Sequence, residues 1–510
     1  MLSRVDFFQG RRIHGVPTAR PLRRRPSALP RPREPSIVIA LLILGALERL
    51  IVTSGSATPY RFEVYNVAAS LVTTGRFADP FGYPSGLTAH VGMLTPLPSA
   101  LAYWLFGVGS PRAEYLLSAW TVFLVCLSIW LCWRLAVALD APRGGRIIAV
   151  AVASLAPLFI AIEVRFGRNY EHVPATVILI WILLRMVQAD AGALSRGWLV
   201  LIGAAAGFPF ILSEAAGLAA IVSLGLFHLL RVPLRRWWIA PVSTLAVVGL
   251  LAGSWTIRNM RELGAPIFLR DTFGLELAIA NYPGAVHPAD PRLAYWTRMT
   301  EIQPMSMTEA ELRAGGGEVA YYRAMGQTAR EWIAAHPWDF LTLCGHRLVE
   351  SFLPPRWFWS PYSAAPERFS GLRQFVVWLA ALVGLATLVA MAPFRRAYAY
   401  ILVAILAYSA PYVLVHPDLR HRYSISTLLI FCALDGSFRL FTYLRARRDI
   451  PNADLCHRVG LSSPSDVRKI EALPASREAS TIHRYLFGRN AERNRNKPLD
   501  KFGPHFWNLP

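Results

Sequence analysis

Residues 36–54 read SIVIALLILGALERLIVTS, and this apolar stretch decides the fold. As a helix it is long enough to cross the roughly 30 Å hydrocarbon core of a bilayer. Comparable runs recur along the chain, for example at 115–139 and 375–392. These runs lack the alternation of a strand, and inside lipid only helices or closed barrels satisfy the backbone hydrogen bonds. The sequence therefore predicts an all-α polytopic membrane protein.

The composition favours a membrane protein and disfavours a nucleic-acid-binding one. Of the 510 residues, 54% are hydrophobic and only 17% are charged, so the chain is more apolar than an ordinary soluble domain. The formal charge is +21, but the basic residues gather in short loops and two tails, as the positive-inside rule expects. The five cysteines are scattered, with no disulfide framework and no metal-ligand spacing. We expect no nucleic-acid partner.

The basic loops predict a topology of about ten spanning helices. An arginine-rich start placed in the cytoplasm makes the later basic clusters cytoplasmic as well. The predicted parts are a basic cytoplasmic segment (1–35), helices one to seven (36–255) with a first external loop (55–113), an external, mostly helical domain (256–371), helices eight to ten (372–443) and a disordered cytoplasmic tail (444–510). The chain is thus expected to be a multi-pass protein of the inner or plasma membrane with both termini in the cytoplasm.

One apolar segment, 96–108, is not counted as a span. It is short and interrupted by proline, so we expect it to be re-entrant or to lie at the membrane surface. Counting it as a helix that crosses would invert every later loop. The few ionisable groups within or near the apolar runs, Glu48, Arg49 and Arg185, are interpreted as snorkelling side chains.

The first external loop contains a candidate general base. Glu63 begins a segment whose apolar spacing predicts a short amphipathic helix along the membrane surface. Partial desolvation there would raise the pKa of the carboxylate toward that of a general base. An acid that only interacts with the helix dipole is the alternative.

Three further polar clusters lie at predicted external helix ends. The loop EVRFGRNYEH at 163–172 holds two acids, two arginines and a histidine, which indicates a site, although snorkelling and helix capping remain an alternative. Arginines after helix seven, in WTIRN at 255–259 and PIFLRDTFGLEL at 266–277, have the geometry to grip a phosphate. In HPDLRHRY at 416–423, two external arginines favour a bound anion over a solvated loop.

At these residues the chain resembles the GT-C glycosyltransferases, specifically the family 39-like bacterial relatives of protein O-mannosyltransferases and of the lipid A aminoarabinose transferase. The resemblance runs from about helix one to helix ten. It rests on the order of the loop at 63–82, the Arg258-Asn259 turn with FGLEL at 273–277, AHPWDF at 335–340, and Arg422-Tyr423. Many members carry an Asp-Glu pair where this chain has Tyr60-Arg61, so either Glu63 is its substitute or the activity differs from that of those members.

The resemblance implies transfer of a sugar from a polyprenyl-phosphate carrier to an acceptor on the outer face of the membrane, with inversion at the anomeric carbon. Glu63 would be the base, and Glu171 a second acid that supports catalysis beside His172. Arg258, Arg420 and Arg422 would bind the phosphate. The matched motifs add Asn259, Glu276 and Tyr423 to the predicted substrate-binding residues. The acceptor, whether protein, lipid or glycan, and a requirement for a divalent cation stay open.

Two other functions remain open. A transporter would also be polytopic, but it usually places polar groups near the bilayer midplane, whereas here most lie at helix ends. An O-antigen ligase or polymerase would also carry a late external domain and outer arginines. The early Glu63 loop favours the transferase.

Overall fold

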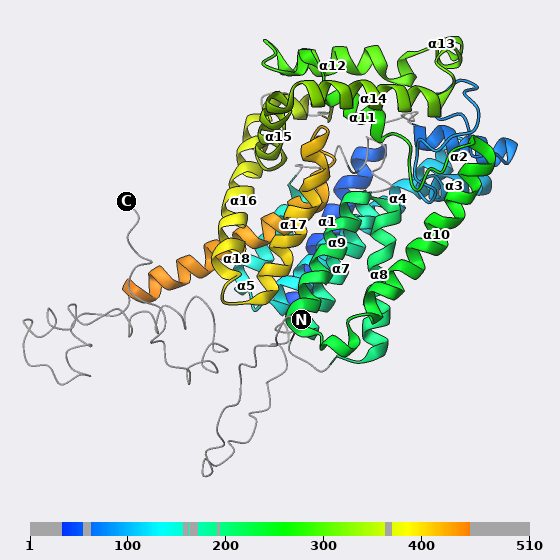
Figure 1. Cartoon of the computed structure of the whole chain (residues 1–510). Coiled ribbons are helices and arrows are strands. Elements are labelled where there is room, and N and C mark those ends of the chain that lie inside the picture. The colour runs from blue at the N-terminus through cyan, green and yellow to red at the C-terminus, as the bar shows by residue number, and fades with distance from the viewer. Residues whose placement is uncertain are drawn as a thin grey trace, which may run out of the picture.

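The computed structural model describes residues 33–54, 63–156, 163, 172–190, 194–362 and 370–448. Within these ranges the chain is helical and contains no strand, which confirms the predicted all-α fold. A bundle of long helices stands beneath a layer of shorter ones (Figure 1). We call the end of the bundle under this layer the domain end and the opposite end the tail end.

The bundle contains a helix at each of the ten predicted positions. These helices are α1 (Arg33–Ser54), α4 (Pro111–Ala138), α5 (Arg143–Leu155), α7 (His172–Ala189), α8 (Arg196–Leu212), α9 (Glu214–Arg231), α10 (Ile239–Leu263), α16 (Ser370–Met391), α17 (Arg396–Leu414) and α18 (Tyr423–Arg448). Eight of them are long and apolar enough to cross a membrane, and α8, with 17 residues, is slightly shorter. Large apolar side chains such as Ile51, Leu250 and Phe375 are exposed on their outer surfaces, as lipid contact requires. The protein is a multi-pass membrane protein.

Small residues let neighbouring helices approach closely. Gly203 and Gly207 lie one turn apart on α8 and face α10, in the small-xxx-small pattern of membrane helix pairs. A Cβ at Gly203 would collide with the backbone of Ala240, and one at Gly207 would press on Val247. The contact between α8 and α10 therefore depends on glycine.

The layer at the domain end consists of α11 (Phe273–Ala280), α12 (Pro291–Ile302), α13 (Glu309–Ala314), α14 (Glu318–Ala335) and α15 (Pro337–Phe352). Its own hydrophobic core includes Leu275, Ile279, Leu312 and Tyr322, and Phe81 of the first external loop packs into that core. The loop is thereby tied to the external layer.

The first external loop contains two helices, α2 (Glu63–Thr74) and α3 (Leu97–Phe106). Buried residues of α2, α3 and the start of α4 form a separate apolar cluster that includes Tyr65, Tyr103 and Leu117. Helix α3 has ten residues and is too short to span. Its Leu101 and Trp104 are exposed.

One predicted boundary differs from the structure, and one break between two external helices was not predicted. Helix seven was expected to end at 255, but α10 continues to Leu263, so Arg258 and Asn259 lie in a helix and not in a turn. Polar residues in its last two turns lower the hydropathy without ending the helix, which stops at Gly264 in the left-handed conformation (φ 67°). The apolar spacing at 318–352 belongs to two helices, which are separated at His336-Pro337.

Arg49 was expected to snorkel, and this prediction is wrong. Its side chain is only 2% exposed, and its Nε lies 2.6 Å from a carboxylate oxygen of Glu163. An Nη1 group also donates to the carbonyl of Ser154 at 2.6 Å. A buried arginine is retained here because a buried acid and carbonyl oxygens compensate its charge.

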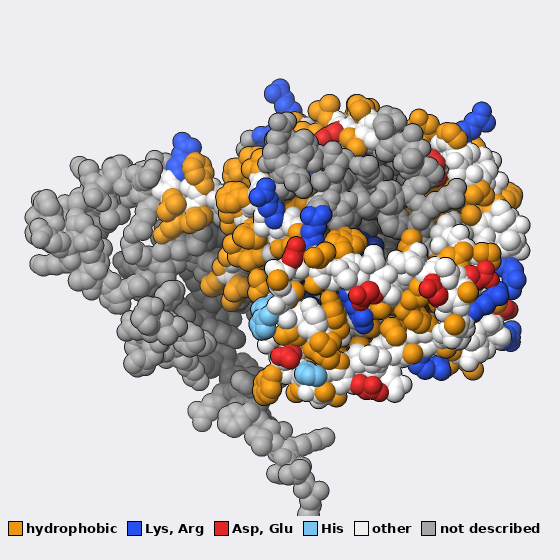
Figure 2. Space-filling view, turned by 90° about the horizontal axis from the view of Figure 1, so that it is seen from above, with side chains coloured by type: hydrophobic (Ala, Val, Ile, Leu, Met, Phe, Trp, Pro, Cys, Tyr) orange, Lys and Arg blue, Asp and Glu red, His pale blue; other side chains and the backbone are white. Residues whose placement is uncertain are grey.

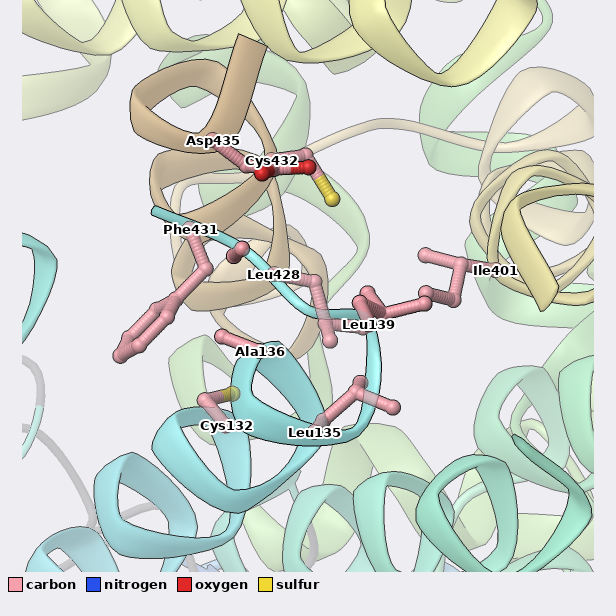
Figure 3. Close-up of a pocket in the computed structure, with 10 residues that line it drawn as sticks. Cys132, Leu135, Ala136, Leu139, Ile401, Leu428, Phe431, Cys432 and Asp435 are labelled. Carbon is pink, nitrogen blue, oxygen red and sulfur yellow. The ribbon is translucent and has the colours of Figure 1, made fainter. Parts of the chain in front are cut away.

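A small cavity of about 10 Å³ lies toward the tail end, between α4 and α18. Figure 3 shows Cys132 and Leu135 on one side and Cys432 and Asp435 on the other. This space suffices for about one water molecule. Its lining is almost entirely apolar, so it has no features of a substrate site.

Candidate functional site

The predicted site residues come mainly from four places at the domain end: the start of α2, the start of α7, α11, and the segment 416–422 that joins α17 to α18. Figure 2 shows this end from above, with charged and histidine side chains among the hydrophobic ones. These helix ends lie at the end of the bundle that the external layer covers.

Glu63 is the first residue of α2 and faces a histidine of the same loop. Its Oε1 lies 3.5 Å from Nε2 of His90, and the two side chains are 18% and 9% exposed. The other ring nitrogen of His90, Nδ1, lies 2.7 Å from the hydroxyl of Tyr322 on α14. Phe81 packs edge-on against the His90 ring. The external layer thus orients the histidine toward Glu63.

The pKa of Glu63 differs from the sequence-based expectation. Burial raises the pKa of this carboxyl, but the hydrogen bond and charge of His90, the backbone and Arg420 together outweigh burial, so the pKa lies below its ordinary value. The expected rise is therefore wrong. Glu63 is held as a carboxylate, which is the form that accepts a proton.

A clamp between the loop and α14 sets the position of His90. Glu318 accepts hydrogen bonds from Thr88 Oγ1 at 2.6 and 2.8 Å and from the Ala89 amide at 2.9 Å. The Thr88 carbonyl in turn accepts from Arg258 Nη1 at 2.8 Å. Residues 88–90 are therefore fixed from both sides.

The guanidinium of Arg258 donates hydrogen bonds to oxygen atoms of the protein. Besides Thr88, it donates to the carbonyl of Phe77 at 3.1 Å and to Asn259 Oδ1 at 2.9 Å. Asn259 is fully buried and donates to the Ile267 carbonyl. Arg258 therefore ties α10 to the first external loop, and Asn259 ties α10 to the segment that follows it.

Glu276 and Arg420 lie close to the Glu63 carboxylate. Burial raises the pKa of Glu276, and the charges of Arg420, Arg270 and His90 offset this rise only in part. Arg420 is partly exposed, and its Nε lies 3.4 Å from Asp418 Oδ2. This part of the site therefore combines Glu63, whose pKa is lowered, with Glu276, whose pKa is raised, and Arg420.

Two histidines flank Arg420 and are neutral. Burial, with Arg347 and Arg420, lowers the pKa of His416 to about 3, and its ring stacks on Tyr295 with centroids 4.2 Å apart. Burial is also the main reason that the pKa of His421 lies well below its usual value. The His421 ring lies 5.6 Å from that of His172, the first residue of α7.

The side chain of Arg422 is buried. Its side chain is 4% exposed, and within the described residues neither Nε nor Nη1 has a hydrogen-bond partner. Burial lowers the pKa of Arg422 to about 9, so the side chain still carries its charge at neutral pH. An isolated buried charge is costly.

The N-termini of two helices meet close to Arg422. Thr176, in the first turns of α7, forms a hydrogen bond with Ser424, the second residue of α18, with the hydroxyl oxygens 2.6 Å apart. Both helices direct their positive dipole ends to this side. Arg422 and the helix ends together make a surrounding that favours an anion.

Two predicted residues are not placed with the others. Glu171 lies outside the described residues. The hydroxyl of Tyr423 donates to Glu163 Oε1 at 2.9 Å and so belongs to the buried Arg49–Glu163 group. In the part of the chain that is described, no three histidine, cysteine or acidic side chains are arranged to hold a metal ion.

Sequence reasoning missed His90, Glu318, Tyr322 and Arg347. Arg347 on α15 is 5% exposed and donates to Asn281 Oδ1 and to the Ala280 and Leu414 carbonyls, which fastens the external layer to α17. His90 is a single histidine in an apolar segment, and no spacing marks it. The partners of all four lie far away in the sequence, so only the fold reveals their roles.

Comparison with known proteins gives only distant matches. No family model and no curated protein sequence matches the chain. The oligosaccharyltransferase AglB of Archaeoglobus fulgidus, in complex with an inhibitory peptide and a dolichol-phosphate, is 14% identical with a TM-score of 0.45, over 90% of this chain and 57% of that one. Its apo form is 15% identical, with a TM-score of 0.47, over 89% and 55%. This chain thus spans little more than half the length of the archaeal protein.

A third solved structure is ArnT from Cupriavidus metallidurans bound to undecaprenyl phosphate. It is 15% identical with a TM-score of 0.34, over 78% of this chain and 76% of that one.

Proposed function

We propose that the protein is a membrane glycosyltransferase that moves a sugar from a polyprenyl-phosphate carrier to an acceptor at the domain end. The observation that carries the proposal is Arg422, a buried arginine whose Nε and Nη1 have no hydrogen-bond partner among the described residues. A protein keeps such a charge when a bound anion compensates it. A carrier embedded in the bilayer brings a phosphate to the membrane surface, where Arg422 and the N-termini of α7 and α18 lie together.

The acidic part of the site supplies the base. Glu63 is held ionised by His90 and takes the proton of the acceptor hydroxyl. The acceptor oxygen forms a bond to the anomeric carbon while the bond from that carbon to the phosphate oxygen breaks, so the configuration inverts. The electron pair leaves with polyprenyl phosphate, whose charge Arg422 and Arg420 stabilise.

The remaining predicted residues receive supporting roles. Glu276, which holds its proton more readily than Glu63, is suited to hydrogen bonding with a substrate hydroxyl. His172 borders the phosphate, and Glu171 stays a second acid in this proposal. Arg258 positions the first external loop, and Asn259 holds Arg258 and the segment after α10. The domain end faces outward from the cell membrane, with both termini in the cytoplasm, as the basic loops favour.

Substitution of Arg422 by methionine, which has a similar reach, tests the phosphate site. Loss of a buried charge is expected to raise the thermal unfolding temperature, since the packing is retained. The same change is expected to weaken binding of a polyprenyl-phosphate sugar by tenfold or more, because hydrogen bonds to charged groups contribute about 1.5–3 kcal/mol. Both are measured in lipid-reconstituted protein by thermal unfolding and by transfer kinetics at varied donor concentration.

Arg313→Gln, at an exposed arginine of α13, is the matched control and should change neither quantity. A less stable Arg422→Met protein with unchanged donor affinity would make Arg422 a structural residue. It would remove the main support for the proposed function.

A further inference from the structure

Two neighbouring helices of the external layer, α14 and α15, expose different kinds of side chain. The exposed residues of α14 include Arg323, Arg330 and Glu331, as expected for a helix face in water. Along α15, which is described over its whole length, no aspartate, glutamate, lysine or arginine is fully exposed. The outward sides of the two helices therefore suit different surroundings.

The exposed side of α15 is largely apolar. Trp338, Leu341, Leu348 and Val349 are between 46% and 78% exposed. With 3.6 residues per turn, these four side chains fall within one arc of about 100° around the helix. We call them the apolar face of α15. In water such a face is unfavourable, since apolar surface is stabilised by removal from water.

The opposite side of α15 fastens the helix to the domain end of the bundle. Leu343, Arg347 and Ser351 follow one another at intervals of four residues and are buried. Arg347 Nη1 donates to the carbonyl of Leu414 at 3.1 Å, and Leu414 is the last residue of the apolar span that α17 forms. The middle of α15 therefore lies within reach of one arginine side chain from the end of that span.

The chain directly after α15 lies deeper. The carbonyl of Pro354 accepts hydrogen bonds from Trp378 Nε1 at 2.9 Å and from Gln374 Nε2 at 3.4 Å. Both donors belong to α16, whose apolar span begins at Gly371, so they lie about 5–10 Å inside that span at 1.5 Å per residue. Figure 1 shows α15 at the edge of the external layer, beside the domain end of α16. The C-terminal end of α15 therefore descends to a level at which α16 exposes Phe375 to lipid.

We propose that α15 is a membrane-binding helix, and that its apolar face enters the boundary between head groups and acyl chains of the leaflet at the domain end. The face continues the lipid-facing surface of α16, where Leu372 and Phe375 are exposed. Amphipathic helices in this boundary are typically buried about 5–10 Å deep, and tryptophan, as at position 338, is favoured there. Because Arg347 lies on the other side of the same helix, the bilayer helps to hold the external layer against the bundle.

Spin labels at single cysteines test the contact with lipid. A nitroxide is attached at Val349→Cys on the apolar face, at Gln327→Cys on the exposed side of α14, and at Phe375→Cys on α16. The full chain, with its native cysteines replaced by serine, is reconstituted in phospholipid vesicles. Power-saturation EPR then compares collisions with oxygen, which concentrates in lipid, and with a water-soluble nickel chelate. Leu348→Cys is a second position on the same face, used if the first variant unfolds at a lower temperature than its background.

We expect the label at 349 to be several-fold more accessible to oxygen than to the chelate, like the label at 375, and the label at 327 to show the reverse. A label at 349 that prefers the chelate would overturn the proposal, because the face would then lie in water. Shielding from both reagents would overturn it too, since a protein partner or a second copy of the chain would then cover the face. The readout does not involve sugar transfer, so failure of transfer would count against the proposed function alone.

Discussion

At the scale of single residues, His90 is the main neighbour that influences Glu63, the proposed general base. The histidine lies within 3.5 Å of Glu63 and is the main influence that lowers the pKa of that carboxyl against the effect of burial. His90→Gln is therefore expected to raise the pKa of Glu63 and to move the acid limb of the transfer rate to higher pH. The pH dependence of kcat/KM measures this change.

The control for His90→Gln is Tyr322→Phe, which removes the hydroxyl that orients the histidine but leaves His90 in place. It should lower the rate without a comparable movement of the acid limb. Identical acid limbs for the wild type and His90→Gln would mean that His90 does not set the ionisation of Glu63.

The raised pKa of Asp271 leads to a prediction about how the stability of the folded protein depends on pH. Burial and the neighbouring Glu318 carboxylate raise this pKa to about 9 in the folded chain, compared with about 3.9 for an unfolded chain. Between these values the folded state holds a proton that the unfolded state releases, so the contribution of Asp271 to stability falls as pH rises and levels off above about 9. Asp271→Asn removes this dependence. The unfolding temperature of the variant relative to wild type should increase from pH 5 to pH 9, and a constant difference would contradict the assignment.

The residues of the site show what sequence patterns were able to predict. Glu63, His172, Arg420 and Arg422 were predicted as site residues because polar groups at the ends of apolar runs are conspicuous, and the structure places all four at the domain end. Their partners were not predictable, since the bond between Tyr423 and Glu163 joins residues 260 positions apart. The local sequence does not distinguish an arginine whose guanidinium donates to loop carbonyls, such as Arg258, from an arginine that binds phosphate.

At the scale of elements, the helices of the bundle were predictable because lipid requires long apolar runs. The end of α10 was not, because its last two turns are polar although still helical. The break between α14 and α15 was also missed, since apolar spacing continues across His336-Pro337 while the backbone changes direction. Hydropathy indicates whether a helix is surrounded by lipid or by water, but it does not locate the residues at which the helix begins and ends.

The contact between α8 and α10 gives a prediction for an element pair. Gly203→Ala places a methyl group against the backbone of Ala240 and the side chain of Ser243, which have little room to move. We expect a loss of about 1–3 kcal/mol, as for other overpacked sites, seen as a lower thermal unfolding temperature. Gly249→Ala in α10 is the control, because nothing lies within 4 Å of its added carbon. Equal effects of the two changes would show that α8 and α10 do not depend on this close approach.

At the scale of the whole molecule, the bundle and the external layer have separate tasks. The bundle brings Arg422 and the N-termini of α7 and α18 together at the domain end, where the proposed function requires a lipid-borne phosphate. The external layer, fastened through Arg347 and Glu318, orients His90 and thereby Glu63. A transferase needs both parts at once, because the acceptor loses its proton as the phosphate departs.

Transfer of a labelled sugar from a polyprenyl-phosphate donor by purified, lipid-reconstituted protein tests this account most directly. The wild type is compared with Glu63→Gln and with Glu309→Gln, an acid of α13 away from the site, at matched folding. We predict transfer by the wild type and Glu309→Gln, and a fall of roughly 10²–10⁴-fold in Glu63→Gln, the usual contribution of a general base. Equal transfer by all three would contradict the role of Glu63, and no transfer by the wild type across a panel of donors would contradict the proposed function itself.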